Sequence, residues 1–141
     1  MEPTETLKHE HQIILLVLDA IENEVRRMRD TGKVDTEKVE KMVDFIRNFA
    51  DRCHHAKEED LLFVKMQERG ISAQSGPIAV MLAEHTEGRG RVKAVAEALP
   101  RAASGDVAAI AAIQDNLSAY VELLRAHIYK EDNILYPMAD R

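Results

Sequence analysis

Hydrophobic residues recur at steps of three and four along four long segments of the chain. In the first segment, residues 4–30, they form one stripe, made of Leu7, Ile14, Leu15, Leu18, Ile21 and Val25. The same spacing continues through residues 36–69, 77–99 and 106–138. Because an α-helix repeats every 3.6 residues, this pattern predicts four amphipathic helices. No segment shows the alternating pattern that would predict a strand.

Turn-forming residues separate the four predicted helices. Gly32 is expected to end the first helix, and Gly70 the second, while Pro77 suits the first turn of the third. Connections this short predict an all-α, antiparallel, up-down-up-down four-helix bundle in which residues 1–141 form a single domain. The third helix is expected either to continue past Pro100 or to be followed by a wrapping loop.

Composition narrows the class of protein. The 141 residues are 45% hydrophobic, which is enough for the core of one domain. The single cysteine, Cys53, excludes an intrachain disulfide and a cysteine-built iron–sulfur or zinc site. A net charge of −6 argues against nucleic-acid binding. We find neither a signal-peptide pattern nor 18 consecutive apolar residues, so we expect a cytoplasmic protein with no membrane partner.

One short motif, His-x-x-Lys-Glu, which we call the phrase, occurs twice in the chain. It begins at His54 and again at His127, in a sequence that holds only six histidines. Residues four apart lie on one face of a helix, so His54 faces the same way as Glu58, and His127 the same way as Glu131. Each copy therefore presents an imidazole beside a carboxylate, and two facing copies would supply half of a dinuclear metal site.

The preceding helix of each half adds one more histidine. His11 follows Glu10 in the first helix and His85 follows Glu84 in the third, so the two halves look like a repeat. His11 and His54 lie about 20 residues on either side of the Gly32 turn, which places them at one level of an antiparallel bundle. The candidate ligands are therefore His11, His54, Glu58, His85, His127 and Glu131.

The types of candidate ligand restrict which metal ions the site would bind. Imidazoles with two carboxylates able to bridge favour a pair of octahedral ions, iron before manganese or zinc. Such a set leaves open positions where O₂, peroxide or NO could bind. Ferritin-like bundles also hold two metals but use Glu-x-x-His with four glutamates, which is not the pattern of this chain.

These motifs resemble the hemerythrin-like, or HHE cation-binding, family over nearly the whole chain. The matching residues are His11, HHAKEE with the following LLF, the EH of LAEHTEGR, and HIYKED with the following ILYP. The resemblance implies a non-heme diiron centre, bridged by carboxylates and an oxo or hydroxo group, inside the bundle. It also implies O₂ binding, oxygen or iron sensing, peroxide handling or repair of damaged iron centres as possible uses.

The chain departs from the oxygen carriers of that family. The carriers have His-x3-His on the third helix, whereas here His85 is followed four residues later by Arg89, which cannot ligate a cation. Arg89 would either pair with a carboxylate or anion near the site, or extend to solvent. The carriers also end with His-x4-Asp, so Asp132 is a rival to Glu131, although the repeat favours Glu131.

Other polar residues near these motifs are expected to lie outside the first ligand set. His55 and Glu59 repeat the spacing one residue later, about 100° around a regular helix, which predicts a solvent-side or outer pair. His9 is expected to be exposed. Tyr120 is expected to be a core residue with an exposed hydroxyl.

Three functions remain open from the sequence. The missing imidazole favours sensing of O₂, peroxide or NO, or stress defence, over simple O₂ carriage. An enzyme that breaks down peroxide or repairs iron centres is the second possibility. The third is an interaction module whose metal site mainly stabilises the fold and reports iron supply. The oligomeric state is not predicted.

Overall fold

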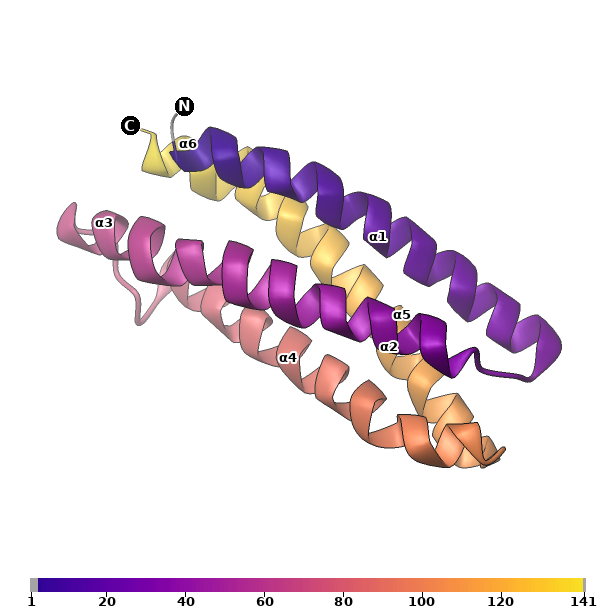
Figure 1. Cartoon of the computed structure of the whole chain (residues 1–141). Coiled ribbons are helices and arrows are strands. Elements are labelled where there is room, and N and C mark those ends of the chain that lie inside the picture. The colour runs from indigo at the N-terminus through magenta and orange to yellow at the C-terminus, as the bar shows by residue number, and fades with distance from the viewer. Residues whose placement is uncertain (1–2, 141) are drawn as a thin grey trace.

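The computed structural model describes residues 3–140, and the predicted all-α four-helix bundle is confirmed. Four long helical rods lie side by side, and the described chain begins and ends at the same end of the bundle (Figure 1). The first rod is α1 (Pro3–Thr31) and the third is α4 (Gly76–Ala103). Among residues 3–140 there is no strand.

The second and fourth rods each contain stretches of π-helix, where the turns are wider than in an α-helix. The second rod consists of α2 (Thr36–Phe45), η1 (Ile46–His55), η2 (Glu58–Leu62) and α3 (Phe63–Glu68). The fourth consists of α5 (Val107–Lys130), η3 (Glu131–Leu135) and α6 (Tyr136–Ala139). π-Helical turns occur mostly as short insertions in α-helices and are frequent at functional sites, so their position beside the two His-x-x-Lys-Glu motifs marks this region as a candidate site.

Local sequence signals set the ends of the rods. Gly32, with φ of 70°, takes the left-handed conformation that ends α1. The carboxylates of Asp35 and Asp106 cap α2 and α5 by accepting hydrogen bonds from backbone N–H groups of their first turns. Helix α4 continues through Pro100 to Ala103, so His85 and His127 come to lie at nearly equal distances from the turn that joins their helices.

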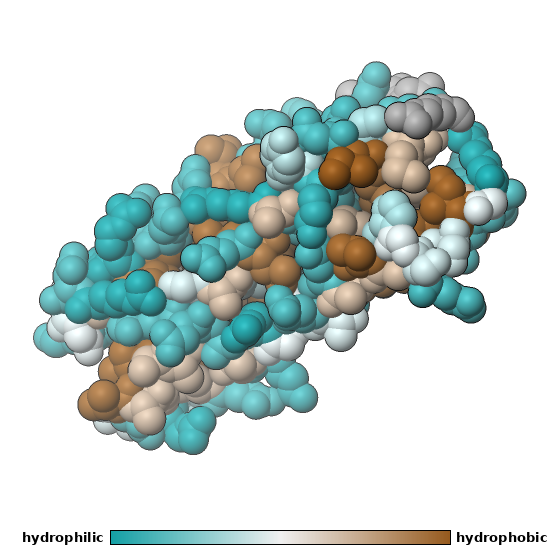
Figure 2. All heavy atoms as spheres, turned by 180° about the vertical axis from the view of Figure 1, so that it is seen from behind, coloured by the Kyte–Doolittle hydropathy of each residue, from teal (hydrophilic) through white to brown (hydrophobic). Residues whose placement is uncertain are grey.

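Two hydrophobic clusters fill the bundle, and the histidines form a polar layer between them. The larger cluster contains residues such as Ile14, Ala50, Val92 and Leu124. The smaller one, near the described ends of the chain, contains Leu7, Leu62, Phe63, Met66, Ile78, Met81, Leu135 and Tyr136. In each rod the histidine lies between a residue of one cluster and a residue of the other. The face shown in Figure 2 is mainly hydrophilic, with hydrophobic residues between the polar ones.

One helical stretch of the described residues, Val107–Ala139, is long and apolar enough to cross a membrane by length and composition alone. In this bundle it packs against α1 and α4, and its inward face carries the imidazole of His127 and the carboxylate of Glu131. A core helix of a bundle meets the same criterion, and in this bundle 33% of the apolar window is buried.

Candidate metal centre

The structure brings all six sequence-predicted ligands together in the buried layer of the bundle. Each of them is at most 2% exposed. They fall into two adjacent groups whose potential ligand atoms lie within 4.8 Å of one another in each group. One group is His11, His54 and Glu131, and the other is Glu58, His85 and His127 together with His55. At metal–ligand distances of about 2.0–2.2 Å, opposite ligands of one ion are about 4–4.4 Å apart, close to this spacing.

The two central carboxylates connect the groups. Oε1 of Glu58 lies 3.3 Å from Nε2 of His54 and 3.6 Å from Nε2 of His85. In the same way, Oε1 of Glu131 lies 3.1 Å from Nε2 of His11, and its Oε2 lies 3.3 Å from Nε2 of His127. Each carboxylate therefore reaches an imidazole of both groups, so each would be able to contribute to both metal positions.

Carboxylates on the outer side orient the imidazole rings. His54 donates from Nδ1 to Glu10 at 2.9 Å, and His127 donates from Nδ1 to Glu84 at 2.9 Å. Lys57 and Lys130, the lysines of the doubled phrase, donate in turn to these two glutamates. The lysine of each phrase thus holds the carboxylate that orients the histidine of the same phrase.

The residue after each central glutamate orients a histidine of the other half. Asp132 accepts from Nδ1 of His11 at 2.8 Å, and Glu59 lies 3.3 Å from Nδ1 of His85. Asp132 and Glu59 therefore lie outside the centre, while Glu131 and Glu58 lie within it. Ligating histidines commonly donate their second ring nitrogen to a carboxylate, which fixes the tautomer and strengthens the ligand.

The inward-facing atoms lack the protons that ordinary hydrogen bonding would require. With Nδ1 protonated, His85 and His127 point the lone pairs of their Nε2 atoms at each other across 3.1 Å. Among residues 3–140, Nε2 of His54, Oε1 of Glu58 and both oxygens of Glu131 are buried with no hydrogen-bond partner. Buried acceptors that face one another are costly without a cation or proton between them, so this donor set fits metal ions.

The pKa values of the two buried carboxyl groups, Glu58 and Glu131, shift in opposite directions. Burial, together with the charge of Glu58, raises the pKa of Glu131 well above its usual range. Burial opposes ionisation of Glu58 as well, but the neighbouring Glu131 carboxyl and the imidazoles of His54 and His85 favour its charged form and lower its pKa well below the usual range. The pair therefore holds a proton that a metal cation would displace.

Tyr136 is part of the site and was missed by the sequence reasoning. Its hydroxyl donates to Oε2 of Glu58 at 2.8 Å and lies 3.3 Å from Nε2 of His11, and its ring stacks on the imidazole of His11. The N–H of Tyr136 bonds to the carbonyl of Glu131, five residues back, through the wide turn of η3. Phe63 occupies the matching place after Glu58, and its ring stacks on His85. A search for aromatic residues nine places after each phrase histidine would have found both.

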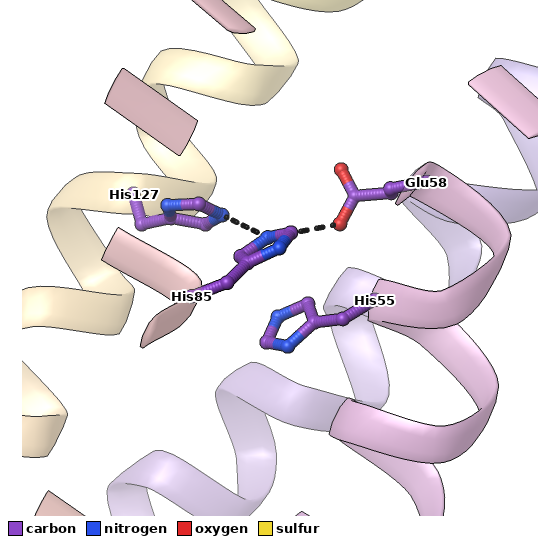
Figure 3. Close-up of side chains that lie close together, drawn as sticks. All are labelled: His55, Glu58, His85 and His127. Atoms are coloured by element: carbon purple, nitrogen blue, oxygen red, sulfur yellow. Dashed lines mark hydrogen bonds and ion pairs between the residues drawn. The ribbon is translucent and has the colours of Figure 1, made fainter. Parts of the chain in front are cut away.

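His55 and Glu59 do not form the solvent-side or outer pair that the regular-helix angle predicts: His55 is buried in the layer, whereas Glu59 does lie outside the centre, near Nδ1 of His85. His55 is 3% exposed, donates from Nδ1 to Asp51 at 3.0 Å, and stacks on His85 with ring centroids 3.9 Å apart. Figure 3 shows its ring facing the group of Glu58, His85 and His127. The π-helix η1 explains the error, because a turn that spans more residues turns His54 and His55 through a smaller angle than a regular helix does. Burial lowers the pKa of His55 to about 4, so the ring is neutral at pH 7.

The remaining polar residues near the site lie further out. Arg89 is exposed and donates to Glu59 at 2.6 Å, so it pairs with a carboxylate and touches the centre only through Glu59 and His85. His9 is exposed, as predicted. The prediction of an exposed hydroxyl on Tyr120 is wrong, because that hydroxyl is buried and has no hydrogen-bond partner among residues 3–140.

An antiparallel four-helix bundle with a buried layer of histidines around two central glutamates defines a class of metal-binding proteins. The chain matches the hemerythrin HHE cation binding domain over residues 2–139 and belongs to that family. The family and the cluster together indicate a metal-binding site whose ligands are histidines and glutamates.

The relatives found by comparison carry no assigned function. Uncharacterized proteins of Mycobacterium tuberculosis and Mycobacterium bovis are each 24% identical to this chain over 133 residues, which cover 94% of the chain. The match covers 51% of those proteins, so the chain spans about half the length of the curated relatives. No solved structure matches the chain significantly.

Proposed function

We propose that the chain holds a non-heme pair of iron ions and binds O₂ or a related small reactive ligand, such as peroxide or NO, in oxygen or redox sensing or in stress defence. The observation that carries the proposal is the convergence of buried Nε2 atoms and carboxylate oxygens on two adjacent positions. His11, His54, Glu58, His85, His127 and Glu131 are the proposed ligands. Glu58 and Glu131 are the proposed bridges.

Nitrogen and carboxylate oxygen donors without thiolate suit iron, with manganese and zinc as the other metals to consider. When bound, an iron pair supplies reversible electron transfer to a small ligand. The outer carboxylates orient the imidazoles, and the hydrophobic clusters on both sides keep bulk water away from the layer.

A second candidate, breakdown of peroxide, is favoured by Tyr136. Its hydroxyl lies inside the layer, between Glu58 and His11, where it can donate a hydrogen bond to a small oxygen-containing ligand. Burial and the nearby charges of Glu58 and Glu131 raise the pKa of Tyr136, so the phenol keeps its proton.

The test is metal analysis with an optical spectrum of protein purified without added metal. Two irons per chain, with charge-transfer bands that change reversibly between O₂ and argon, support the binding function. Multiple turnovers with hydrogen peroxide support the second candidate instead. Stoichiometric zinc with no visible band would overturn both and leave a structural metal site.

A further inference from the structure

We propose that His55 is a metal ligand and supplies the imidazole that helix α4 lacks at Arg89. The inference rests on the proposed dinuclear site. It gives the two metal positions five histidines, three of them (His55, His85 and His127) beside Glu58 and two (His11 and His54) beside Glu131. The third imidazole of the position beside Glu58 is then that of His55, which lies in the second rod of the bundle.

The geometry of the ring supports this role. The imidazole of His55 lies within the group formed with Glu58, His85 and His127, and its Nδ1 is held by Asp51. Figure 3 shows the four side chains converging from three rods of the bundle. His54, His127, His11 and His85 are held from Nδ1 by carboxylates in the same way, so His55 shares the arrangement of every proposed histidine ligand.

The second His-x-x-Lys-Glu motif has hydrophobic residues at the two positions that match His55 and Asp51 of the first. Ile128 follows His127 as His55 follows His54, and Leu124 precedes His127 by the same three residues as Asp51 precedes His54. Both Ile128 and Leu124 are buried in the larger hydrophobic cluster. The first copy therefore places a buried polar pair, His55 with Asp51, where the bundle can hold two aliphatic side chains. A buried polar pair costs desolvation energy that aliphatic residues do not, which favours a functional reason for it.

The wide turns of η1 allow the side chains of His54 and His55, which are adjacent in sequence, both to reach the buried layer. A regular helix would turn His55 about 100° away from His54. Within η1 both rings are buried, His54 toward the group with His11 and His55 toward the group with His85. One π-helical segment thus lets two consecutive residues reach two different metal positions.

The decisive variant is D51L/H55I, in which the two residues of the first copy are replaced by those at the matching positions of the second copy, Leu124 and Ile128. Since Leu124 and Ile128 are the natural residues at the matching places, the variant is expected to fold, with metal-free thermal stability equal to or above that of the parent. Cobalt(II) titration, followed by bound stoichiometry and by the d–d absorption spectrum, is the measurement. His9→Gln, which removes an exposed histidine, is the matched control.

We expect D51L/H55I to bind one of the two cobalt ions at least tenfold more weakly, because even outer partners of metal-ligating histidines contribute 10- to 100-fold to affinity. The spectrum of that ion is expected to change, while His9→Gln behaves as the parent. Two ions bound by D51L/H55I with unchanged affinity and spectrum would overturn the assignment of His55. Cobalt reports the ligands without iron or O₂, so a failure of the proposed function would appear separately, as a parent protein that binds two cobalt ions but shows no iron-dependent chemistry.

Discussion

The hydroxyl of Tyr136 donates a 2.8 Å hydrogen bond to Glu58, which lies 78 residues away in the chain. Both side chains are fully buried, so the bond joins the end of the fourth rod to the middle of the second inside the polar layer. It gives the carboxylate one donor on the side that faces the smaller hydrophobic cluster, which includes the ring of Tyr136.

Tyr136→Phe is expected to destabilise the metal-free protein by about 1–3 kcal/mol, because it leaves a buried carboxylate oxygen without its donor. The measurement is urea unfolding followed by circular dichroism. Tyr120→Phe is the matched control: its buried hydroxyl has no partner among residues 3–140, so that variant is expected to be as stable as the parent or more stable. Equal losses in the two variants would contradict the role of the hydrogen bond.

His54→Ala and His127→Ala are each expected to abolish dinuclear metal binding and to lower the Tm of the metal-loaded protein. Each variant removes an imidazole whose Nε2 lies 3.3 Å from a central glutamate. The measurement is metal content per chain after purification, with His9→Ala as the control for loss of an exposed histidine. Two irons retained by either site variant would refute the ligand assignment.

Glu10→Gln and Glu84→Gln test the outer carboxylates. Each of these glutamates accepts from the Nδ1 of a phrase histidine, His54 or His127, and is held by a lysine. The neutral amide orients the ring less firmly and donates less charge, so metal affinity is expected to fall about 10- to 100-fold. Competition with a chelator measures the change. Glu87→Gln, at an exposed position of α4, is expected to have no effect.

The pH dependence of stability can be tested away from the metal centre at Glu24. Hydrogen bonds from Arg27, opposed by burial and assisted by Lys38, lower the pKa of this carboxyl below its usual value of 4.5. A carboxyl whose pKa is lowered in the folded state adds stability above its unfolded pKa, and that stability is lost as pH falls through the folded value.

We therefore expect Glu24→Gln to lose about 1 kcal/mol of unfolding free energy at pH 7, since both cationic partners are partly exposed. The difference from the parent is expected to shrink as the pH is lowered below 4.5. Urea unfolding of the metal-free protein across this range is the measurement. A difference that stays constant with pH would show that the carboxylate charge of Glu24 does not matter.

The four-helix bundle could be predicted from the sequence, because amphipathic spacing and turn residues determine helices and their ends from nearby residues alone. The sequence was also sufficient to select the six residues that converge, because residues four apart, such as His54 and Glu58, stay on one face whether the turn is regular or slightly widened. The repeat distinguished Glu58 from Glu59 and Glu131 from Asp132, and the structure places the first of each pair at the centre.

The parts that could not be predicted depend on wide turns and on contacts between rods. His55 was placed by the angle of a regular helix, which does not hold in η1, and Tyr136, which the wide turn of η3 brings to the site, was not considered. Nothing near Glu10 in the sequence shows that it serves His54, 44 residues later, because that contact exists only after two rods pack together.

The widened turns make the metal centre depend on residue count as well as on residue type. In η2 and η3 a hydrogen bond that would span four residues spans five, so each stretch accommodates one residue more than a regular helix of the same rise. In η1 the N–H of Ala56 likewise bonds five residues back, to Asp51. Deleting a single residue in residues 46–53 would remove no histidine or glutamate, yet the stretch could then close into a regular helix, in which His54 and His55 lie about 100° apart. Relatives that keep the same motif letters but differ by one residue in this stretch would therefore present a different set of side chains to the interior.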